Sequence, residues 1–249
     1  MSDVPDFFRR LWRLPEPQHR RGRRSTLDVE TVVGTAVRLA DAGGLEAATL
    51  PKVADELGVT AMSLYRHVGS KHELLMLMVD AATEPPSRTV SDSGWREGLR
   101  QWAVDLWSLY QERPWLPRVP VYRAPSGPHQ IAWLEQGFEA LSPTDLDWGD
   151  QLMALTTLSG FVRQSALLRQ ELEQGREPGQ GQSASERAYG EALLQVVDPE
   201  RFPRTAATLR SPALGEAPET ADHDFTQGLE LLLDGLAVRI GGDGPDPTA

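Results

Sequence analysis

The 249-residue sequence contains no cysteine, and this absence removes several classes of chemistry at once. Without thiols the chain cannot form disulfides, thiolate metal sites or a cysteine nucleophile. It also lacks any run of about 18 apolar residues, so we expect no membrane-spanning helix. At the N-terminus, arginines and aromatic residues stand where a secretion signal would have an apolar segment and a small-residue cleavage site. These features predict a cytoplasmic protein.

The sequence is equally poor in the signatures of catalysis. Its histidines are scattered and none has the spacing of an HExxH-type metal site: His19, His67, His72, His129 and His223. A GxSxG elbow, a P-loop and a glycine-rich dinucleotide fingerprint are all missing. Carboxylates are plentiful, but on amphipathic helices they most often form solvated faces. We therefore expect neither an enzyme nor a cofactor or metal site.

Alternating strand patterns are absent as well, and apolar residues recur instead at helical spacing. In the C-terminal part these patterns predict helices at 95–110, 131–141, 147–172, 202–209 and 224–240, with further order near 189–197. The Gly, Gln and Ser-rich segment 175–185 predicts a mobile loop, and 211–221 predicts a linker. The expected fold class is all-α.

The stretch 50–68 reads LPKVADELGVTAMSLYRHV and carries two short helical patterns around a glycine. Thr49 is the expected N-cap of the first helix and Gly58 ends it. Thr60 is the expected N-cap of the second, whose Leu64 and Val68 point inward. This spacing predicts a helix-turn-helix, in which the second helix can lie in a DNA major groove while the first braces it. Short helical hairpins also occur as plain structure.

The flanking segments complete a small domain. Asp28 is placed to cap a helix whose apolar residues run from Val29 to Ala40, and two glycines follow it. Ser70 and Glu73 form the pattern of a capping box for a fourth helix that runs towards Pro85. This fourth helix is the expected linker to the second domain.

These residues resemble the DNA-binding domain of TetR-family transcriptional regulators, over about the first 80 residues. The resemblance is carried by Leu27-Asp28, Ala40-Asp41-Ala42-Gly43-Gly44-Leu45, Val53-Ala54-Asp55-Glu56-Leu57-Gly58-Val59, Met62-Ser63-Leu64-Tyr65-Arg66-His67-Val68, and Lys71 before Leu74-Leu75. Pro51 departs from the pattern, because many members have arginine or another polar residue there. The resemblance implies a ligand-responsive homodimer on a palindromic operator in double-stranded DNA, most often a repressor, with a small-molecule effector.

Together with the outward helix faces, the resemblance predicts a set of DNA-contacting residues: Thr49, Lys52, Thr60, Ala61, Met62, Ser63, Tyr65, Arg66, His67 and Lys71. Ala61, Met62 and Ser63 are expected to face base edges. Contacts from Tyr65, His67 and Lys71 are expected to go mostly to phosphates. For Arg66, both a base contact and a phosphate contact are left open. An enzyme and a helical interaction module are the competing hypotheses, and a gel shift separates all three.

The net charge of −11 lies entirely in the C-terminal part, because residues 1–83 hold 11 Lys and Arg against 11 Asp and Glu. Four arginines just ahead of the first helix are expected to reach phosphates or a minor groove: Arg20, Arg21, Arg23 and Arg24. The alternative is a tail that docks on the body through Phe8, Leu11 and Trp12. The expected divisions are a flexible basic arm 1–26, a helix-turn-helix domain 27–72, a ligand-binding and dimerisation domain 73–241, and a disordered tail 242–249.

In the second domain, Phe225-Thr226-Gln227-Gly228-Leu229-Glu230 and Leu233-Asp234-Gly235-Leu236 resemble the closing helix of one class of TetR C-terminal domain. The resemblance implies that this helix and the long helix 147–172 form a four-helix bundle with their copies in a second subunit. Small Ser159 and Gly160 would permit close helix approach. The expected dimer interface comprises Ser159, Val162, Ala166, Leu229, Leu232, Leu233, Leu236 and Ile240.

A cluster of aromatic and apolar residues suggests a cavity for a small apolar or aromatic effector. The expected lining is Met78, Trp102, Leu106, Trp107, Tyr110, Trp115, Tyr122, His129, Trp133, Phe138, Met153, Thr157, Phe161 and Gln164. The alternative is a packed aromatic core, and the methionines also fit ordinary core filling.

Overall fold

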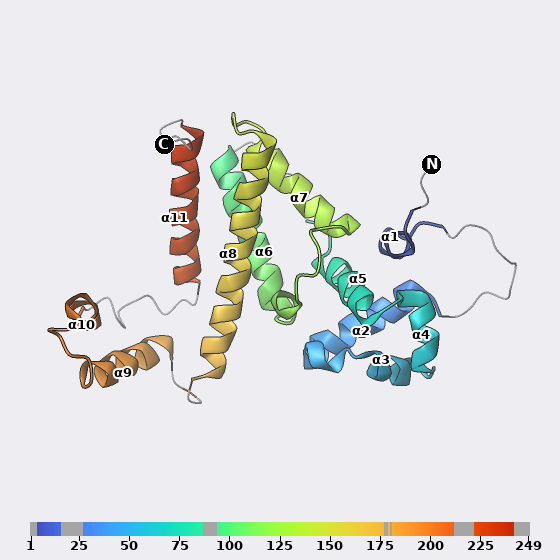
Figure 1. Cartoon of the computed structure of the whole chain (residues 1–249), viewed down its shortest axis with the longest axis horizontal. Coiled ribbons are helices and arrows are strands. Elements are labelled where there is room, and N and C mark those ends of the chain that lie inside the picture. Colours follow the sequence, from blue (N-terminus) through green and yellow to red (C-terminus); the bar gives the residue numbers. More distant parts are fainter. Residues whose placement is uncertain are drawn as a thin grey trace, which may run out of the picture.

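The computed structural model describes residues 4–15, 27–86, 94–176, 179, 181–211 and 222–241, and in these residues it contains helices and no strand (Figure 1). The all-α prediction is therefore confirmed. No helix in these ranges is long and apolar enough to cross a membrane. The helices are α1 (Asp6–Leu11), α2 (Val29–Gly43), α3 (Leu50–Leu57), α4 (Ala61–Val68), α5 (Lys71–Thr83), α6 (Trp95–Glu112), α7 (Pro128–Leu141), α8 (Trp148–Gln174), α9 (Gln182–Leu194), α10 (Pro203–Leu209) and α11 (His223–Ile240), with 3-10 turns η1 (Leu45–Ala47) and η2 (Leu116–Arg118).

Helices α2 to α5 form the N-terminal unit, with α2 at its centre. Val32 and Val33 on α2 are buried against Leu64 and Val68 of α4 in the common core. Gly58 ends α3 in a left-handed conformation with φ 65°, which a side chain would disfavour. The predicted helix-turn-helix is therefore present, and its short helices depend on α2 for burial.

Helix starts follow the capping predictions only in part. The Asp28 carboxylate accepts a hydrogen bond from the Thr31 backbone N–H at 2.8 Å, as predicted. Ser70 Oγ accepts from the Glu73 N–H at 3.1 Å. Thr49 and Thr60 occupy the N-cap positions of α3 and α4, but their side chains make no capping hydrogen bond. The predicted N-cap positions are therefore confirmed, but residue type does not fix the rotamer that a capping hydrogen bond requires.

The C-terminal body is organised around α6, which contacts α7, α8 and α11 (Figure 1). The apolar stripe on α6 is wide, and Leu99, Trp102, Leu106 and Trp107 are all buried. Helix α8 begins at Asp147, whose carboxylate accepts from the Asp150 N–H at 2.8 Å. Because α8 is 27 residues long, it spans the body from one end to the other.

Two arginines of α6 form ion pairs with Glu230 of α11, and Arg96 also pairs with Asp234 on the same helix. Arg100 Nε lies 2.6 Å from Glu230 Oε1, and Arg96 Nη2 lies 2.7 Å from Glu230 Oε2. Hydrogen bonds from Arg100 and then Arg96 lower the pKa of Glu230 to about 2. A carboxyl group with a lowered folded-state pKa stabilises the fold above its ordinary pKa of 4.5. We therefore expect this contribution to be lost as the pH falls from 4.5 towards 2.

Two segments differ from the sequence-based expectation. Residues 6–11 of the expected flexible arm form α1, in which Leu11 is buried as the docking alternative predicts, Phe7 is also buried, and Phe8 is only partly buried. Helix α9 begins at Gln182, inside the segment expected to be a loop. Helices α9 and α10 pack on each other and project to one side of the body (Figure 1). Their boundaries depend on this tertiary pairing, which the local composition does not reveal.

Candidate functional site

The outer face of α4 presents the residues that the sequence predicts to contact DNA. Met62 has 72 % of its surface exposed and Tyr65 has 44 %, although both are large hydrophobic residues. Arg66 is also exposed, and Lys71 is exposed at the start of the next helix. The inward face is buried. An eight-residue helix that exposes Met62 and Tyr65 beside two cations has the features of a DNA-reading surface.

Some of the predicted DNA contacts already have partners within the chain. Ser63 Oγ donates to the Thr60 carbonyl at 2.6 Å, and Lys52 Nζ donates to the Glu46 carbonyl at 3.1 Å. Ala61, Ser63, His67 and Thr49 are partly buried, whereas Lys52 and Thr60 are exposed. Arg20, Arg21, Arg23 and Arg24 lie outside the described residues.

Helix α5 joins the rest of the N-terminal unit to the C-terminal body. Because α4 carries the candidate DNA-contacting face, we call α2 to α4 the DNA-reading unit. The buried Asp80 carboxylate accepts hydrogen bonds from the N–H groups of His129 at 3.0 Å and Gln130 at 3.1 Å. The His129 ring adds a third contact to the same residue, with Nδ1 2.9 Å from the Asp80 carbonyl oxygen, which accepts. Asp80 therefore caps the N-terminus of α7 from a neighbouring helix. Sequence reasoning missed this role, because the partners are far apart in the chain.

Two predicted cavity residues also serve this junction. Trp115 Nε1 donates to Asp41 Oδ1 of α2 at 2.7 Å, and Trp133 Nε1 donates to the Glu84 carbonyl just after α5 at 2.9 Å. Both rings are buried. With His129, they connect the two halves of the chain. A buried indole N–H group needs an acceptor, and Asp41 near the end of α2 and Glu84 just after α5 provide these acceptors.

The remaining aromatic residues pack against one another. Trp107 stacks on Phe225 at 4.3 Å between ring centroids, and Phe161 lies 5.7 Å from the same ring. Trp102 meets Trp133 edge-on at 6.1 Å and donates to its carbonyl at 2.9 Å. This arrangement favours the packed-core alternative for these residues.

The other members of the expected cavity lining are dispersed. Met78 and Leu106 are buried core residues, and burial raises the pKa of Tyr110. Phe138 meets Trp148 edge-on, and Gln164 is exposed. Tyr122 is 44 % exposed and lies 4.5 Å from the His72 ring, near the start of α5.

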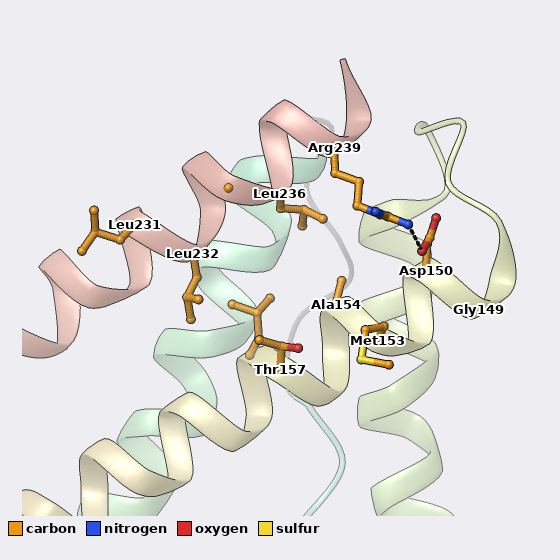
Figure 2. Close-up of a pocket in the computed structure, with 11 residues that line it drawn as sticks. Gly149, Asp150, Met153, Ala154, Thr157, Leu231, Leu232, Leu236 and Arg239 are labelled. Carbon is orange, nitrogen blue, oxygen red and sulfur yellow. Dashed lines mark hydrogen bonds and ion pairs between the residues drawn. The ribbon is translucent and has the colours of Figure 1, made fainter. Parts of the chain in front are cut away.

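An open groove of about 680 Å³ runs between α8 and α11 (Figure 2). Its walls combine apolar side chains of both helices with one ion pair, between Arg239 Nη2 and Asp150 Oδ1 at 2.8 Å. Leu231 is 73 % exposed and Met153 is 65 % exposed. The lining residues are Gly149, Asp150, Met153, Ala154, Thr157, Leu158, Leu231, Leu232, Gly235, Leu236 and Arg239. Met153 and Thr157 were expected in the aromatic cavity, and the structure places them here instead.

The groove divides the expected dimer interface into two sets. Leu232 and Leu236 line the groove, and Ser159 and Ile240 remain partly exposed. The side chains of Val162, Ala166, Leu229 and Leu233 are buried inside the single chain. These four cannot provide the surface of a dimer, which corrects the prediction. Leu231 is the exposed groove residue that the prediction omitted, although its position in an apolar run on α11 was a usable signal.

Clusters of three or more potential metal ligands are absent from the described part of the chain. Three features of the described residues can bind a partner or couple the two parts of the chain: the α4 face, the α5 junction and the α8–α11 groove. Each has the geometry of a binding or coupling element.

Two family models match the sequence. The one for bacterial regulatory proteins of the tetR family matches residues 32–77, which contain the α3–α4 pair. The one for the tetracyclin repressor-like C-terminal domain matches residues 89–240. The first therefore covers the DNA-reading unit and the second covers the body that holds the groove.

Individual proteins support the same assignment. The HTH-type transcriptional repressor DrrR1 of Streptomyces coeruleorubidus is 36 % identical over 225 residues, covering 88 % of this chain and 81 % of the relative. ActR of Streptomyces coelicolor, solved in complex with actinorhodin, has a TM-score of 0.72 at 26 % identity, covering 89 % of this chain and 100 % of the other. ActR in complex with (S)-DNPA has a TM-score of 0.69 at 26 % identity, covering 86 % and 99 %.

Proposed function

Because the chain belongs to the TetR family of bacterial regulatory proteins and is a DNA-binding transcriptional regulator, we propose that it is a homodimeric repressor released from a palindromic operator by a small apolar or aromatic effector. The observation that carries the DNA-binding part is the exposed face of α4, with Met62 and Tyr65 outward and Lys71 adjacent. The relative DrrR1 is named a transcriptional repressor, and this supports repression as the mode of regulation.

The proposed division of labour on α4 follows from side-chain chemistry. Met62 is apolar and exposed, so it can pack on a thymine methyl group in the major groove. Tyr65, His67 and Lys71 can donate hydrogen bonds to phosphate oxygens, which fix the position of the helix without reading sequence. Phosphate contacts also make the affinity fall with salt concentration.

The α8–α11 groove supports the proposed homodimer. A monomeric protein seldom leaves a large contiguous apolar surface in water. Leu231, Met153 and Leu236 lie along this open surface, and a second copy related by a two-fold axis would cover it. Two DNA-reading units held in this way can meet successive major-groove half-sites, which one small unit cannot do.

The aromatic core around α6 supports the proposed effector class, together with the bound actinorhodin and (S)-DNPA of the ActR structures. An effector between α6 and its neighbours would have to separate ring pairs such as Trp102 and Trp133. Helix α5 contacts both α2 and α7, so movement of the body would reach α4 through it. The effector must bind one arrangement more tightly than the other, since equal affinities shift nothing.

Exchange of Met62 for glutamine tests the proposed reading surface. Glutamine forms paired hydrogen bonds with adenine, so Met62→Gln is expected to change the preferred base at one position in each half-site by about 1–3 kcal/mol. The measurement is competition binding across a set of duplexes that differ at single positions. Lys71→Ala is the matched control, because loss of a phosphate contact is expected to weaken all duplexes alike and to reduce the salt slope by about 1 per half-site.

Two results would contradict this assignment. If Met62→Gln kept the wild-type base preference, the outer face of α4 would not be reading bases. If Lys71→Ala altered the preference, the division between phosphate and base contacts would be wrong.

A further inference from the structure

Helix α1 lies outside both family matches, which cover residues 32–77 and 89–240, yet it is a folded part of the molecule. Phe7 and Leu11 are buried, and α1 packs against α5 (Figure 1). A six-residue helix has almost no stability alone. Its position therefore depends on the contacts that its side chains make with the rest of the chain.

The central contact of α1 is made by Arg10 at the turn between α4 and α5. Its guanidinium forms an ion pair with Glu73 in the first turn of α5. Gly69 ends α4 with φ 76°, and a Cβ placed on it would lie 2.6 Å from Arg10 Nη2. Glu73 Oε2 would lie closer still to this Cβ, so the Arg10–Glu73 ion pair fills the space beside the turn that sets the direction of α4. Since both charged side chains are less than a third exposed, this pair is screened less than one on an open surface.

The other contacts of α1 reach both parts of the protein. Arg13 forms an ion pair with Glu30 on α2, within the DNA-reading unit. Trp12 Nε1 donates to the Ser126 carbonyl at 2.9 Å, just before α7 in the C-terminal body. The Arg123 guanidinium lies 5.3 Å from the centre of the Phe7 ring. Helix α1 therefore bridges α2, α5 and the segment that leads into α7.

We propose that α1 is a brace for the DNA-reading unit and that Arg10 is a positioning residue for α4. This inference rests on one part of the proposed function, namely that α4 reads DNA. Base contacts require side chains to be held within narrow geometric limits, whereas phosphate contacts tolerate more movement. Release of the α4–α5 turn therefore weakens specific binding more than non-specific binding. Arg10 is neutralised by Glu73 and so acts through the turn, without itself touching a phosphate.

The test compares Arg10→Met with Arg9→Met, which removes the same charge from the same helix. Arg9 Nε donates to the Val4 carbonyl, within the N-terminal segment. Affinity is measured on a duplex selected from random DNA by the wild-type protein and on a scrambled duplex of equal length. Arg10→Met is expected to weaken the selected duplex about fivefold to tenfold, a modest coupling between sites, and to leave the scrambled duplex unchanged. Arg9→Met is expected to change the ratio of the two affinities little.

Substitutions of Glu73, the ion-pair partner of Arg10, distinguish positioning of α4 from a direct contact between Arg10 and DNA. Glu73→Gln is expected to reproduce the loss, and the double variant with Arg10→Met is expected to be no worse than either single variant. The exchange Arg10→Glu with Glu73→Arg is expected to recover part of the specific affinity. Arg10→Lys keeps the charge but loses the planar guanidinium, so its affinity for the selected duplex is expected to lie between those of wild type and Arg10→Met. This variant replaces Arg10→Met in the test if the methionine variant fails to fold.

Three outcomes would overturn the proposal. Equal weakening on both duplexes would mean that Arg10 contacts phosphates, no change on either duplex would mean that α1 does not position α4, and tighter binding would mean that α1 opposes DNA binding. If the wild-type protein selects no duplex, the proposed function fails, and amide hydrogen exchange then tests the brace alone. Arg10→Met is expected to speed exchange in α4 and leave α8 unchanged; equal rates in α4 would contradict the brace.

Discussion

Leu231→Asp is expected to convert the proposed homodimer into a monomer without unfolding the chain. In the single chain Leu231 is 73 % exposed, so an aspartate there remains in water and costs the monomer little. In the proposed dimer the same side chain is buried on the α8–α11 groove, where an unpaired charge costs about 3–5 kcal/mol. For one side chain that cost corresponds to a dissociation constant raised by about 150-fold to 5,000-fold, and a two-fold symmetric dimer contains the substitution twice, so the measured rise is expected to be at least this large.

A matched control separates the interface from general surface effects. Val196 is 78 % exposed after α9 and is not among the residues that line the groove, so Val196→Asp introduces the same charge elsewhere on the surface. Sedimentation equilibrium over a concentration series measures both dissociation constants, and circular dichroism checks that both variants remain helical. A Leu231→Asp protein that associates as tightly as Val196→Asp would place the interface outside the groove.

Asp80→Ala is expected to lower the free energy of unfolding by about 2–5 kcal/mol. The substitution removes the acceptor of two N–H groups at the start of α7, from His129 and Gln130. Each buried group left unpaired costs about 1–3 kcal/mol. The junction between α5 and α7 is lost at the same time. Urea unfolding monitored by circular dichroism and by tryptophan fluorescence measures the effect, and unequal midpoints would indicate that the two halves no longer unfold together.

Asp80→Asn is the control for this substitution, because its side-chain oxygen can still accept both hydrogen bonds. Burial raises the pKa of Asp80, since desolvation outweighs the donors on α7. A raised folded-state pKa means that the carboxyl group stabilises the fold below its ordinary pKa of 3.8 and loses this contribution as the pH rises through the folded pKa. The stability of wild type relative to Asp80→Asn is therefore expected to fall as the pH rises above 3.8. An alanine variant as stable as wild type would contradict the capping role.

The elements predicted from sequence were those with local signals. Asp28, Ser70 and Asp147 each accept a backbone hydrogen bond at a helix start, because a capping side chain reaches only two or three residues along its own chain. Leu64 and Val68 are buried because their four-residue spacing puts them on one face. The DNA-reading unit was therefore predictable from sequence in its helices and in its faces.

The elements missed were those decided by contacts between distant residues. The four-residue spacing of Leu229 and Leu233 puts them on one face of α11, but nothing local shows whether that face packs inside the chain or against a second copy; both residues are buried in the chain, whereas Leu231 is exposed on the groove. Asp80 resembled an ordinary acidic residue on a helix until α7 was placed against it. Helix α1 has only six residues, too few for a periodic pattern, and its stability comes from α5.

Selection of duplexes from random DNA by the wild-type protein, followed by native mass spectrometry of the complex, tests the central claim most directly. A dimer that reads DNA with two copies of α4 is expected to enrich an inverted repeat and to place two chains on one duplex. The half-site centres are expected to lie about one helical turn apart, roughly 34–36 Å, or a multiple of that distance. Failure to enrich any sequence, or enrichment of an unrepeated site occupied by a single chain, would contradict the account.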